Sequence, residues 1–438
     1  MVILAPIMLQ PWFAEAKFGV FLHWGIYSTG RTSESWAFFN GEISHEDYMA
    51  QASEFTASHY DPDVWARLFA EAGAKYAVLT TKHHDGFALW PTKVSHLNSV
   101  EGAPAGRDLI GPYCDALRKH GLKVGLYFSH LDWTHPDYAS VLPKGWQPHD
   151  HSNMHSNPFG YPQNGESTQR WENFLAFHRA QLKELCTEYK PDLLWFDGDW
   201  ERDPEQWRFE ELRDQLQQWA PGVIVNSRMG GYGDYGTPEQ AVPIQTPKQI
   251  WELCLTSNDH WGYFEGDTNF KTPRECMRIL AECAGMGGNL LLDIGPKVDG
   301  SLQPEQTELL QKIGRWAHKH GEALYGTTSG LPHGHFYGPS TLSADRHTLY
   351  LFLFDIPRDE IAVKGIRNPI KSASVVGSNH ELKHHVSGGA PWAHLPGITW
   401  IAVPQDVLDD DITVIKVEFD APLDLYSGSG DDAVNNVQ

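Results

Sequence analysis

The sequence predicts an α/β fold, a (β/α)8-like barrel of the TIM type, followed by a C-terminal β-sandwich domain. From Lys17 to about Gly326, short apolar runs alternate with amphipathic segments, as repeated βα units around a parallel sheet require. After about Gly330 the helical segments stop, and short apolar runs are separated by Gly, Pro and Asp turns. We therefore divide the chain into a barrel, residues 1–330, and a β-sandwich, residues 331–438.

The strands predicted for the barrel are continuously apolar, because parallel strands covered by helices are buried on both faces. They are Phe18–His23, Tyr76–Thr80, Lys123–Phe128, Leu193–Phe196, Val223–Val225 and Leu290–Ile294. The helices expected between them are Pro62–Ala72, Leu109–His120, Trp171–Tyr189, Pro204–Trp219, Pro273–Gly285 and Pro304–His320. A closed barrel has eight strands, so one or two are not located, and a doubly wound sheet is the competing topology.

The predicted β-sandwich contains the apolar runs TLYLFLF, SASVVG, TWIAVP and TVIKVEF. Two other segments are expected to lack regular structure. The segment His149–Ser167 is rich in His, Asn, Pro and Gly, and we interpret it as a long loop that is a candidate substrate lid. The tail SGSGDDAVNNVQ has the composition of a frayed terminus.

The composition favours a neutral partner. The chain carries 34 Lys and Arg against 56 Asp and Glu, a formal charge of -22, which argues against unaided binding to nucleic acid or to an anionic membrane surface. The 17 Trp could supply flat apolar platforms for sugar rings, although most Trp in any fold belongs to the core.

The cysteines and the N-terminus bear on the compartment. The 5 Cys are odd in number and form no CxxC pair, so neither a disulfide framework nor a zinc knuckle is indicated. The segment MVILAPIMLQPWF has no basic region before its apolar run and no small-residue cleavage site after it. We therefore expect a cytoplasmic protein without a signal peptide. No stretch approaches the roughly twenty apolar residues that span a bilayer.

Polar residues follow the ends of the predicted strands, where a parallel barrel gathers its active-site side chains. In chain order these residues are His23, His83 with His84, Tyr127, His130, Asp197, Arg228 and, after the short run Gln249–Trp251, Glu252. A carboxylate at the end of a buried strand is costly unless it is hydrogen-bonded or needed. Asp197 is therefore a candidate catalytic residue, and a helix N-cap is the alternative interpretation.

Seven ordered motifs between Trp12 and about Thr327 resemble those of the α-L-fucosidases of glycoside hydrolase family 29. They are KFGVFLHWGIYS (Lys17–Ser28), GAKYAVLTTKHHDGFALWPTK (Gly73–Lys93), GRDLIGPY (Gly106–Tyr113), GLKVGLYFSHLDW (Gly121–Trp133), PDLLWFDGDWE (Pro191–Glu201), IWELCLTSNDHWGY (Ile250–Tyr263) and GNLLLDIGPKVDG (Gly288–Gly300). Because these matches keep their order over most of the barrel, they are far more specific than any single motif.

This resemblance implies a retaining exo-α-L-fucosidase that removes terminal fucose from oligosaccharides or glycoconjugates without a cofactor or a metal ion. The family's nucleophile falls on Asp197 and its acid/base residue on Glu252. The positions that surround the sugar fall on His23, His83, His84, Tyr127, Trp195 and Arg228, with Trp261 in the pocket wall.

The chemistry of these residue types is consistent with that assignment. A retaining glycosidase needs one carboxylate to attack the anomeric carbon and a second to protonate the leaving oxygen, with about 5 to 5.5 Å between them. Imidazoles can bind sugar hydroxyls, and aromatic side chains can form an apolar wall for the methyl group of fucose. We expect Arg228 to keep Asp197 ionised and an apolar neighbour such as Trp251 to raise the pKa of Glu252.

The sequence departs from the family pattern at two places. Where a Glu-Trp pair is common, this chain has Ser33-Glu34-Ser35-Trp36, so either Glu34 or only Trp36 contacts the sugar. Asp293 stands where Asn is frequent, and we expect it to act through a neighbour. The acid/base position is on a less regular segment, and the alternatives to Glu252 are Asp199, Glu201, Asp259 and Glu265.

Three other functions compete with this interpretation. A metal-dependent hydrolase would account for the many His at strand ends, but no HxH follows the first strand and no HExxH is present. A glycan-binding protein that has lost turnover would keep the pocket. A hydrolase of a similar sugar, such as α-L-galactose, would differ only around C5 and C6 of its substrate. The linkage preference and the oligomeric state have no clear sequence signal.

Overall fold

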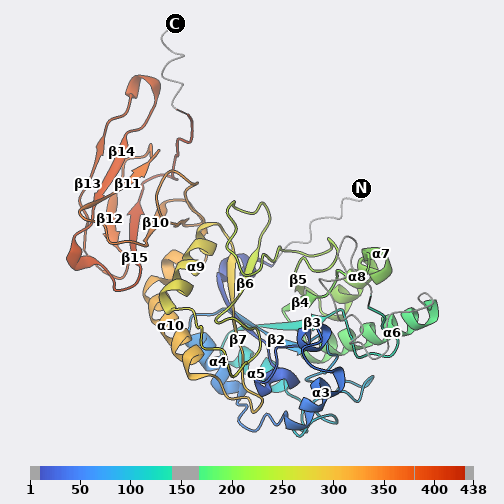
Figure 1. The fold of residues 1–438 in the computed structure, drawn as a ribbon. Coiled ribbons are helices and arrows are strands. Elements are labelled where there is room, and N and C mark those ends of the chain that lie inside the picture. The colour runs from blue at the N-terminus through green and yellow to red at the C-terminus, as the bar shows by residue number, and fades with distance from the viewer. Residues whose placement is uncertain (1–9, 141–166, 379, 430–438) are drawn as a thin grey trace.

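A curled parallel sheet forms the centre of the molecule (Figure 1). The computed structural model describes residues 10–140, 167–378 and 380–429, so the predicted loop His149–Ser167, except its last residue, and the end of the tail lie outside the described residues. The seven strands have the order β5-β4-β3-β2-β1-β7-β6. Their bounds are β1 Phe18–Leu22, β2 Tyr76–Lys82, β3 Lys123–Ser129, β4 Leu193–Asp197, β5 Ile224–Val225, β6 Glu252–Thr256 and β7 Asn289–Ile294.

The gap between β5 and β6 is closed by a segment that is not a regular strand. Isolated parallel bridges join Asn226 to Tyr235, Gly236 to Trp251 and Glu239 to Cys254. Residues 235–239 therefore run beside β6 in the direction of the other strands and take the eighth position. This pairing confirms the predicted (β/α)8-like barrel and rejects the doubly wound alternative, which has no closed sheet.

Helices cover the outside of the barrel (Figure 1). The main ones are α4 Pro62–Glu71, α5 Ile110–Lys119, α6 Thr168–Glu184, α8 Phe209–Trp219, α9 Pro273–Gly285 and α10 Pro304–Leu324. Asp61 caps α4 by accepting the amide of Val64, and Thr272 with Glu275 forms a capping box on α9. The single helix predicted over 204–219 is broken into α7 Pro204–Trp207 and α8, because Arg208 between them has a φ of 54°.

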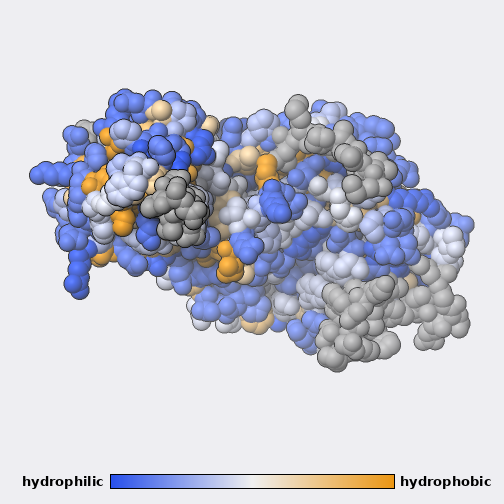
Figure 2. All heavy atoms as spheres, turned by 90° about the horizontal axis from the view of Figure 1, so that it is seen from above, coloured by the Kyte–Doolittle hydropathy of each residue, from blue (hydrophilic) through white to orange (hydrophobic). Residues whose placement is uncertain are grey.

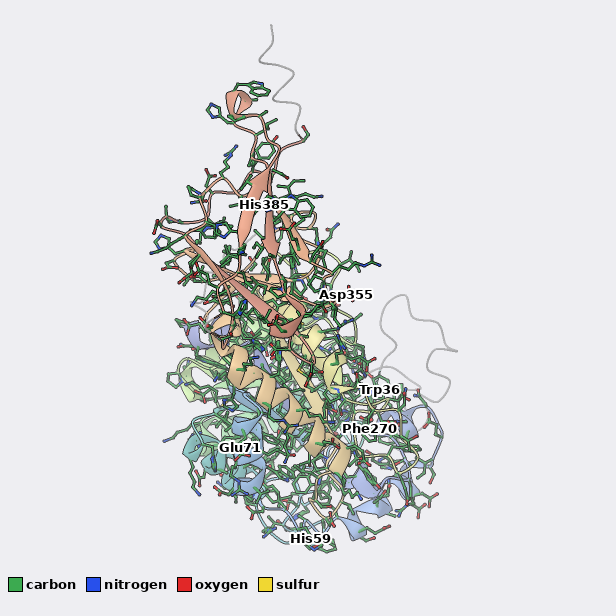
Figure 3. The ribbon with its side chains drawn as sticks, turned by 90° about the vertical axis from the view of Figure 1, so that its left-hand side faces the viewer. Trp36, His59, Glu71, Phe270, Asp355 and His385 are labelled. Atoms are coloured by element: carbon green, nitrogen blue, oxygen red, sulfur yellow. The ribbon has the colours of Figure 1, made fainter. Side chains whose placement is uncertain are left out.

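Short elements between β1 and β2 lie over the carboxyl ends of the barrel strands. They are η1 Ile26–Thr29, α2 Trp36–Phe39, α3 His45–Ala50 and η2 Gln51–Glu54. Trp36 of α2 lies on the barrel below the C-terminal domain in Figure 3. The remaining short elements are α1 Pro11–Ala16 and the π-turn η5 Leu185–Tyr189, which extends α6.

Two antiparallel sheets form the predicted β-sandwich. One has the order β12-β15-β10-β9-β8 and the other the order β11-β14-β13. Their bounds are β8 Thr328–Ser329, β9 Ser340–Leu342, β10 Thr348–Leu353, β11 Glu360–Lys364, β12 Ser372–Val375, β13 His384–Ser387, β14 Ile398–Ala402 and β15 Thr413–Glu418, with the 3-10 turns η6 Pro391–Ala393 and η7 Gln405–Val407. Residues such as Leu351, Ile361 and Ile401 fill the core between the sheets.

The five-stranded sheet also packs on the barrel. Phe352 and Val414 belong to the same apolar cluster as Trp316 of α10, and the indole N–H of Trp316 donates to the carbonyl of Ile412 at 3.0 Å. In Figure 1 this places the sandwich beside α9 and α10. The sandwich lies beside these helices, and the pocket is formed by the seven-stranded sheet and its loops.

Polar side chains dominate the face of the molecule seen in Figure 2. Figure 2 shows mostly hydrophilic colour over both the sandwich and the barrel, with small separate hydrophobic areas. Among the described residues, no helix is long and apolar enough to cross a membrane. All five Cys are free and buried.

Candidate active site

A cavity of about 300 Å³ opens among the loops that follow the carboxyl ends of the barrel strands. It is lined by Phe21, His23, Glu34, Trp36, His83, Tyr127, Trp195, Asp197, Trp200, Arg228, Glu239, Cys254 and Trp261. The cavity therefore brings together most of the residues predicted to bind the sugar, including both Glu34 and Trp36 of the divergent Ser33–Trp36 segment. His84 and Glu252 are the predicted site residues that do not line it.

Asp197 is the last residue of β4 and is 8% exposed. Its Oδ1 accepts a hydrogen bond from Nη1 of Arg228 at 2.7 Å, and its Oδ2 accepts one from the hydroxyl of Tyr127 at 2.9 Å. Both donors hold the carboxylate in one orientation. The chain turns at Gly198, whose φ of 80° suits glycine, so the Asp197 side chain stays at the pocket while the backbone leaves the sheet.

Two neighbours fix the end of β4. The side chain of Asn226 accepts from the amide of Phe196 at 2.9 Å and donates to the same residue's carbonyl at 2.8 Å. The amide of His130 donates to the carbonyl of Asp197 at 2.8 Å. These bonds continue the sheet past β5, which has only two residues, and hold the backbone of Asp197 in place.

Arg228 connects Asp197 to a second carboxylate. Its Nη2 donates to Glu239, and its guanidinium lies 4.7 Å above the ring of Trp195. Burial opposes the charge of Arg228, but Asp197 and Glu239 raise its pKa well above the usual value. A single planar guanidinium therefore bridges two carboxylates of the pocket, with one charge-assisted hydrogen bond to each from a different nitrogen.

The structure places Glu252, the residue predicted as acid/base, away from the cavity. Glu252 is the first residue of β6, at the opposite end of the strands from Asp197, and it is completely buried. It accepts hydrogen bonds from the hydroxyl of Tyr76 and from Nε1 of Trp195, the latter at 2.9 Å. Burial raises the pKa of Glu252 to about 7, against the effect of these two bonds. Trp195 lines the pocket and separates Glu252 from it.

The sequence pattern places Glu252 just after the short run Gln249–Trp251, as if at the end of a strand, whereas the structure begins β6 at Glu252. Glu239, which the sequence pattern did not single out, lies at the carboxyl end of the bridging segment 235–239 and lines the cavity. The signal available in the sequence is an acidic residue shortly after Arg228, in Thr237-Pro238-Glu239-Gln240, which looks like a turn.

The alternative acids named for this role contact other groups. The carboxylate of Asp199 accepts from the amide of Gly230 at 3.0 Å, and that of Glu201 accepts from Trp133, Tyr138 and Ser140. Asp259 accepts from the side-chain amide of Asn269 at 3.0 Å. These residues and Glu265 are absent from the pocket lining, so Glu239 and Glu34 are the carboxylates that accompany Asp197 there.

The histidines of the site are neutral. Burial lowers the pKa values of His23, His83 and His84 well below the usual value. The hydroxyl of Ser129 donates to the carbonyl of Leu131 at 2.8 Å, so it accepts from Nδ1 of His84 at 2.6 Å. Nε2 of His84 therefore carries a lone pair. It lies 3.6 Å from Asp197 Oδ2 and, within the part of the chain that the structure describes, has no hydrogen-bond partner.

His23 and His83 are held by other neighbours. Nδ1 of His23 lies 2.7 Å from Oδ1 of Asp293, which is buried and whose pKa burial raises well above the usual value. Nδ1 of His83 lies 2.5 Å from the hydroxyl of Ser35. Asp293 is thus in contact with the site through His23. Ser35, between Glu34 and Trp36, positions a histidine rather than contacting the cavity.

A chain of buried side chains supports Arg228 from behind. Arg179 can only donate, so Nδ1 of His178 accepts from it at 2.9 Å, and Nε2 of His178 donates to Nδ1 of His130 at 3.0 Å. Nε2 of His130 then donates to the carbonyl of Arg228 at 3.2 Å. Burial lowers the pKa of His130 to about 3, so its ring is neutral. The hydrogen bonds of this series therefore all run in one direction, from Arg179 to the carbonyl of Arg228.

Within the described part of the chain, His83, His84 and Asp197 form one group whose ligand atoms lie within 4.8 Å of one another. This is the distance range of a metal site, but Asp197 already binds the cationic Arg228 at 2.7 Å and a Tyr hydroxyl at 2.9 Å. A divalent cation would be repelled by the guanidinium. The group fits a neutral polar ligand better than a metal ion.

Comparison with known proteins identifies the family. Residues 5–322 match the family model described as alpha-L-fucosidase. Mouse tissue alpha-L-fucosidase is 36% identical over 348 residues, which cover 73% of this chain and 72% of that protein.

Two solved structures are similar over almost the whole chain. The alpha-L-fucosidase isoenzyme 1 of Paenibacillus thiaminolyticus has a TM-score of 0.82 and 32% identity, covering 93% of this chain and 98% of its own. A GH29 alpha-L-fucosidase of Bacteroides thetaiotaomicron, trapped as a covalent intermediate with 2-fluoro-fucosyl fluoride, has a TM-score of 0.80 and 25% identity, covering 94% and 96%. The chain, with its barrel, sandwich and carboxylate-lined pocket, belongs to the alpha-L-fucosidase family, GH29.

Proposed function

We propose that this protein hydrolyses terminal α-L-fucosyl linkages of oligosaccharides or glycoconjugates with net retention of configuration, using Asp197 as nucleophile and Glu239 as acid/base residue. The observation that carries this proposal is the single guanidinium of Arg228 bound to both carboxylates at the open end of the barrel. The covalent intermediate trapped in the Bacteroides relative supports a mechanism with two displacements.

In the first step, a carboxylate oxygen of Asp197 attacks the anomeric carbon of fucose. The bond from that carbon to the leaving oxygen breaks, and Glu239 transfers its proton to the leaving oxygen. The products are a fucosyl ester of Asp197, the free alcohol and the carboxylate of Glu239. Tyr127 and Arg228 hold Asp197 before the attack, so its orientation is set in advance.

In the second step, Glu239 accepts a proton from a water molecule, whose oxygen attacks the same carbon and releases Asp197. About 40% of the Glu239 side chain is exposed, so water can reach it, whereas Asp197 is 8% exposed. This difference fits an acid/base residue that exchanges protons with solvent and a nucleophile that does not.

The rest of the pocket fits a small deoxy sugar. The neutral imidazoles of His23 and His83 offer donors and acceptors for hydroxyls, while Phe21 and Trp261, with ring centroids 6.1 Å apart, offer an apolar surface for a methyl group. A cavity of about 300 Å³ lies at the small end of ligand pockets and has room for one terminal sugar. Exo-acting hydrolysis follows from this size.

The test is the stereochemistry of turnover. An aryl α-L-fucoside is added to the protein in an NMR tube, and the anomeric proton of the first released fucose is followed before mutarotation. The proposal predicts that the α-anomer appears first. Initial release of the β-anomer would mean a single displacement, and no release would leave a sugar-binding protein without turnover.

A further inference from the structure

The pocket has a buried floor and a partly exposed rim. Phe21, Tyr127 and Trp195 on the floor are at most 2% exposed, and His23 and His83 at most 5%. Trp36, Trp200, Trp261 and Glu239 are more exposed and surround the mouth. One sugar fills the floor, so the group attached to its anomeric oxygen has to leave through this rim.

Two of the rim tryptophans form a continuous aromatic wall. The rings of Trp36 and Trp200 are nearly parallel, with centroids 6.0 Å apart and planes at 20°. Each lies edge-on to the ring of His84 at 5.7 Å. Nε2 of His84 is 3.6 Å from Asp197, so the wall begins one side chain away from the proposed nucleophile.

Both members of this wall are held firmly. The ring of Trp36 contacts that of Trp133 at 5.1 Å, and Figure 3 shows Trp36 on the barrel, well separated from His385 of the sandwich. Trp200 lies between Asp197, which ends β4, and the buried Glu201, whose carboxylate accepts bonds from Trp133 and Tyr138. A partly exposed Trp in such a fixed position provides a preformed surface with little entropy to lose on binding.

The wall of Trp36 and Trp200 is separate from Trp261, the third tryptophan of the rim. Trp261 contacts the floor, with its ring 5.0 Å from His23, and belongs with the fucose pocket. Trp36 and Trp200 contact His84, which lies near Oδ2 of Asp197, while Arg228 binds Oδ1 of Asp197 and connects it to Glu239. A leaving group protonated by Glu239 therefore has to pass through the rim to which Trp36 and Trp200 belong.

We infer that Trp36 and Trp200 form a binding site for the leaving group, which stacks the apolar face of a neutral pyranose such as N-acetylglucosamine. Trp200 then determines specificity for the leaving group and leaves recognition of fucose unchanged. The mouth carries the carboxylates of Glu34, Asp197 and Glu239 against one Arg228, so a neutral sugar fits and an acidic one is disfavoured. The inference rests on the proposed fucosidase function and adds its leaving-group specificity.

The test compares two substrates that share fucose and differ in the leaving group. α-L-Fucosyl fluoride has a leaving group of one atom that cannot stack, whereas a fucosylated N-acetylglucosamine disaccharide presents a full ring. For Trp200→Ala, kcat/KM on the disaccharide is expected to fall about tenfold or more, and kcat/KM on the fluoride to stay within about threefold. Trp200→Phe, which keeps a smaller ring, is expected to fall between wild type and Trp200→Ala.

A second measurement uses the proposed fucosyl ester of Asp197. With fucosyl fluoride as donor and N-acetylglucosamine added as acceptor, the fucosyl ester partitions between water and the sugar. Trp200→Ala is expected to lower the ratio of transfer product to free fucose, because the acceptor binds where the leaving group did. Trp219→Ala, a partly buried Trp at the end of α8 and outside the pocket, is the control and is expected to keep both the ratio and the disaccharide activity.

Two outcomes overturn the inference. An equal loss on fluoride and disaccharide would mean that Trp200 contacts fucose itself. Unchanged kinetics on both substrates would mean that the wall takes no part in binding. Failure of the wild type to turn over fucosyl fluoride would instead contradict the proposed function, so the two hypotheses fail in different ways.

Discussion

Asp197 and Glu252 lie at opposite ends of one barrel, and their surroundings differ accordingly. Both carboxylates are buried and both accept a hydrogen bond from a tyrosine hydroxyl. Asp197 ends β4 and borders the cavity, where it is paired with Arg228, whereas Glu252 begins β6 and is enclosed beneath Trp195. Burial raises the pKa of Glu252 to about 7, a value that suits a general acid.

This comparison shows that strand direction decides which carboxylate can act. In a parallel barrel the loops that accept substrate follow the carboxyl ends of the strands, and the amino ends form the packed base. A raised pKa from burial is shared by catalytic and structural groups. The end of the strand on which a carboxylate lies is therefore the stronger criterion, and it supports the proposed role of Glu239 rather than one for Glu252.

The largest expected effect is at Asp197. Asp197→Asn keeps the size of the side chain and removes the attacking charge, so kcat for an aryl fucoside should fall about 10⁴-fold or more. Steady-state release of the aryl alcohol measures this. A loss of less than about tenfold would remove Asp197 from the role of nucleophile.

Glu239→Gln should come next, and its effect should depend on the leaving group. An aryl fucoside with a poorly acidic alcohol needs proton donation, so its kcat/KM should fall about 10² to 10⁴-fold. A dinitrophenyl fucoside, which leaves without a proton, should lose far less in kcat/KM. Equal losses on the two substrates would contradict an acid role for Glu239.

A smaller effect is expected at His130, which does not line the cavity. His130→Phe removes the donor to the carbonyl of Arg228 and leaves Nε2 of His178 unpaired, so kcat/KM should fall about tenfold. His130→Gln can donate to Arg228 and accept from His178, and it should recover much of the loss. If His130 had only a structural role, the glutamine variant would recover no activity when its thermal stability equals that of the phenylalanine variant.

The smallest effect on turnover is expected at Glu252. In Glu252→Gln the carbonyl can still accept from Trp195, and the hydroxyl of Tyr76 can rotate to accept from the amide. Turnover should therefore stay within about threefold of wild type.

The same variant has a signature in stability. The pKa of Glu252 is raised to about 7 in the folded protein from 4.5, so the folded state binds the extra proton between these values. The contribution of Glu252 to stability is fully present below about pH 4.5 and is lost as the pH rises to about 7. The unfolding free energy of wild type minus that of Glu252→Gln should fall over this range in denaturant titrations. A pH-independent difference would contradict the burial of an ionisable carboxyl group.

The sequence could predict the strands that are apolar throughout. Leu193–Asp197 and Asn289–Ile294 were recognisable because both faces of such a strand are buried, and polar residues at their ends pointed to the cavity. The start of β6 was not recognisable. A buried Glu at the first position of a strand looks like a residue that follows a strand, because its hydrogen-bond donors Tyr76 and Trp195 are distant in sequence. Only the tertiary structure brings those donors together.

The segment that carries Glu239 lacks any local signal of a strand. Gly236, Thr237 and Pro238 are typical of a turn, and their extended conformation depends on bridges to β6 and to Asn226. Trp200 was equally unpredictable as part of the rim, since its contact with Trp36 joins loops from two different strands. Long-range pairing thus determines the features that local patterns miss.

The most direct test of the two-carboxylate account is azide rescue of Glu239→Gly on a dinitrophenyl fucoside. The first step needs no acid with this substrate, and azide replaces the base-assisted water in the second step. The account predicts that azide restores turnover and that the product is α-L-fucosyl azide, identified by NMR. No rescue, or a β-configured azide, would contradict Glu239 as the acid/base residue opposite Asp197.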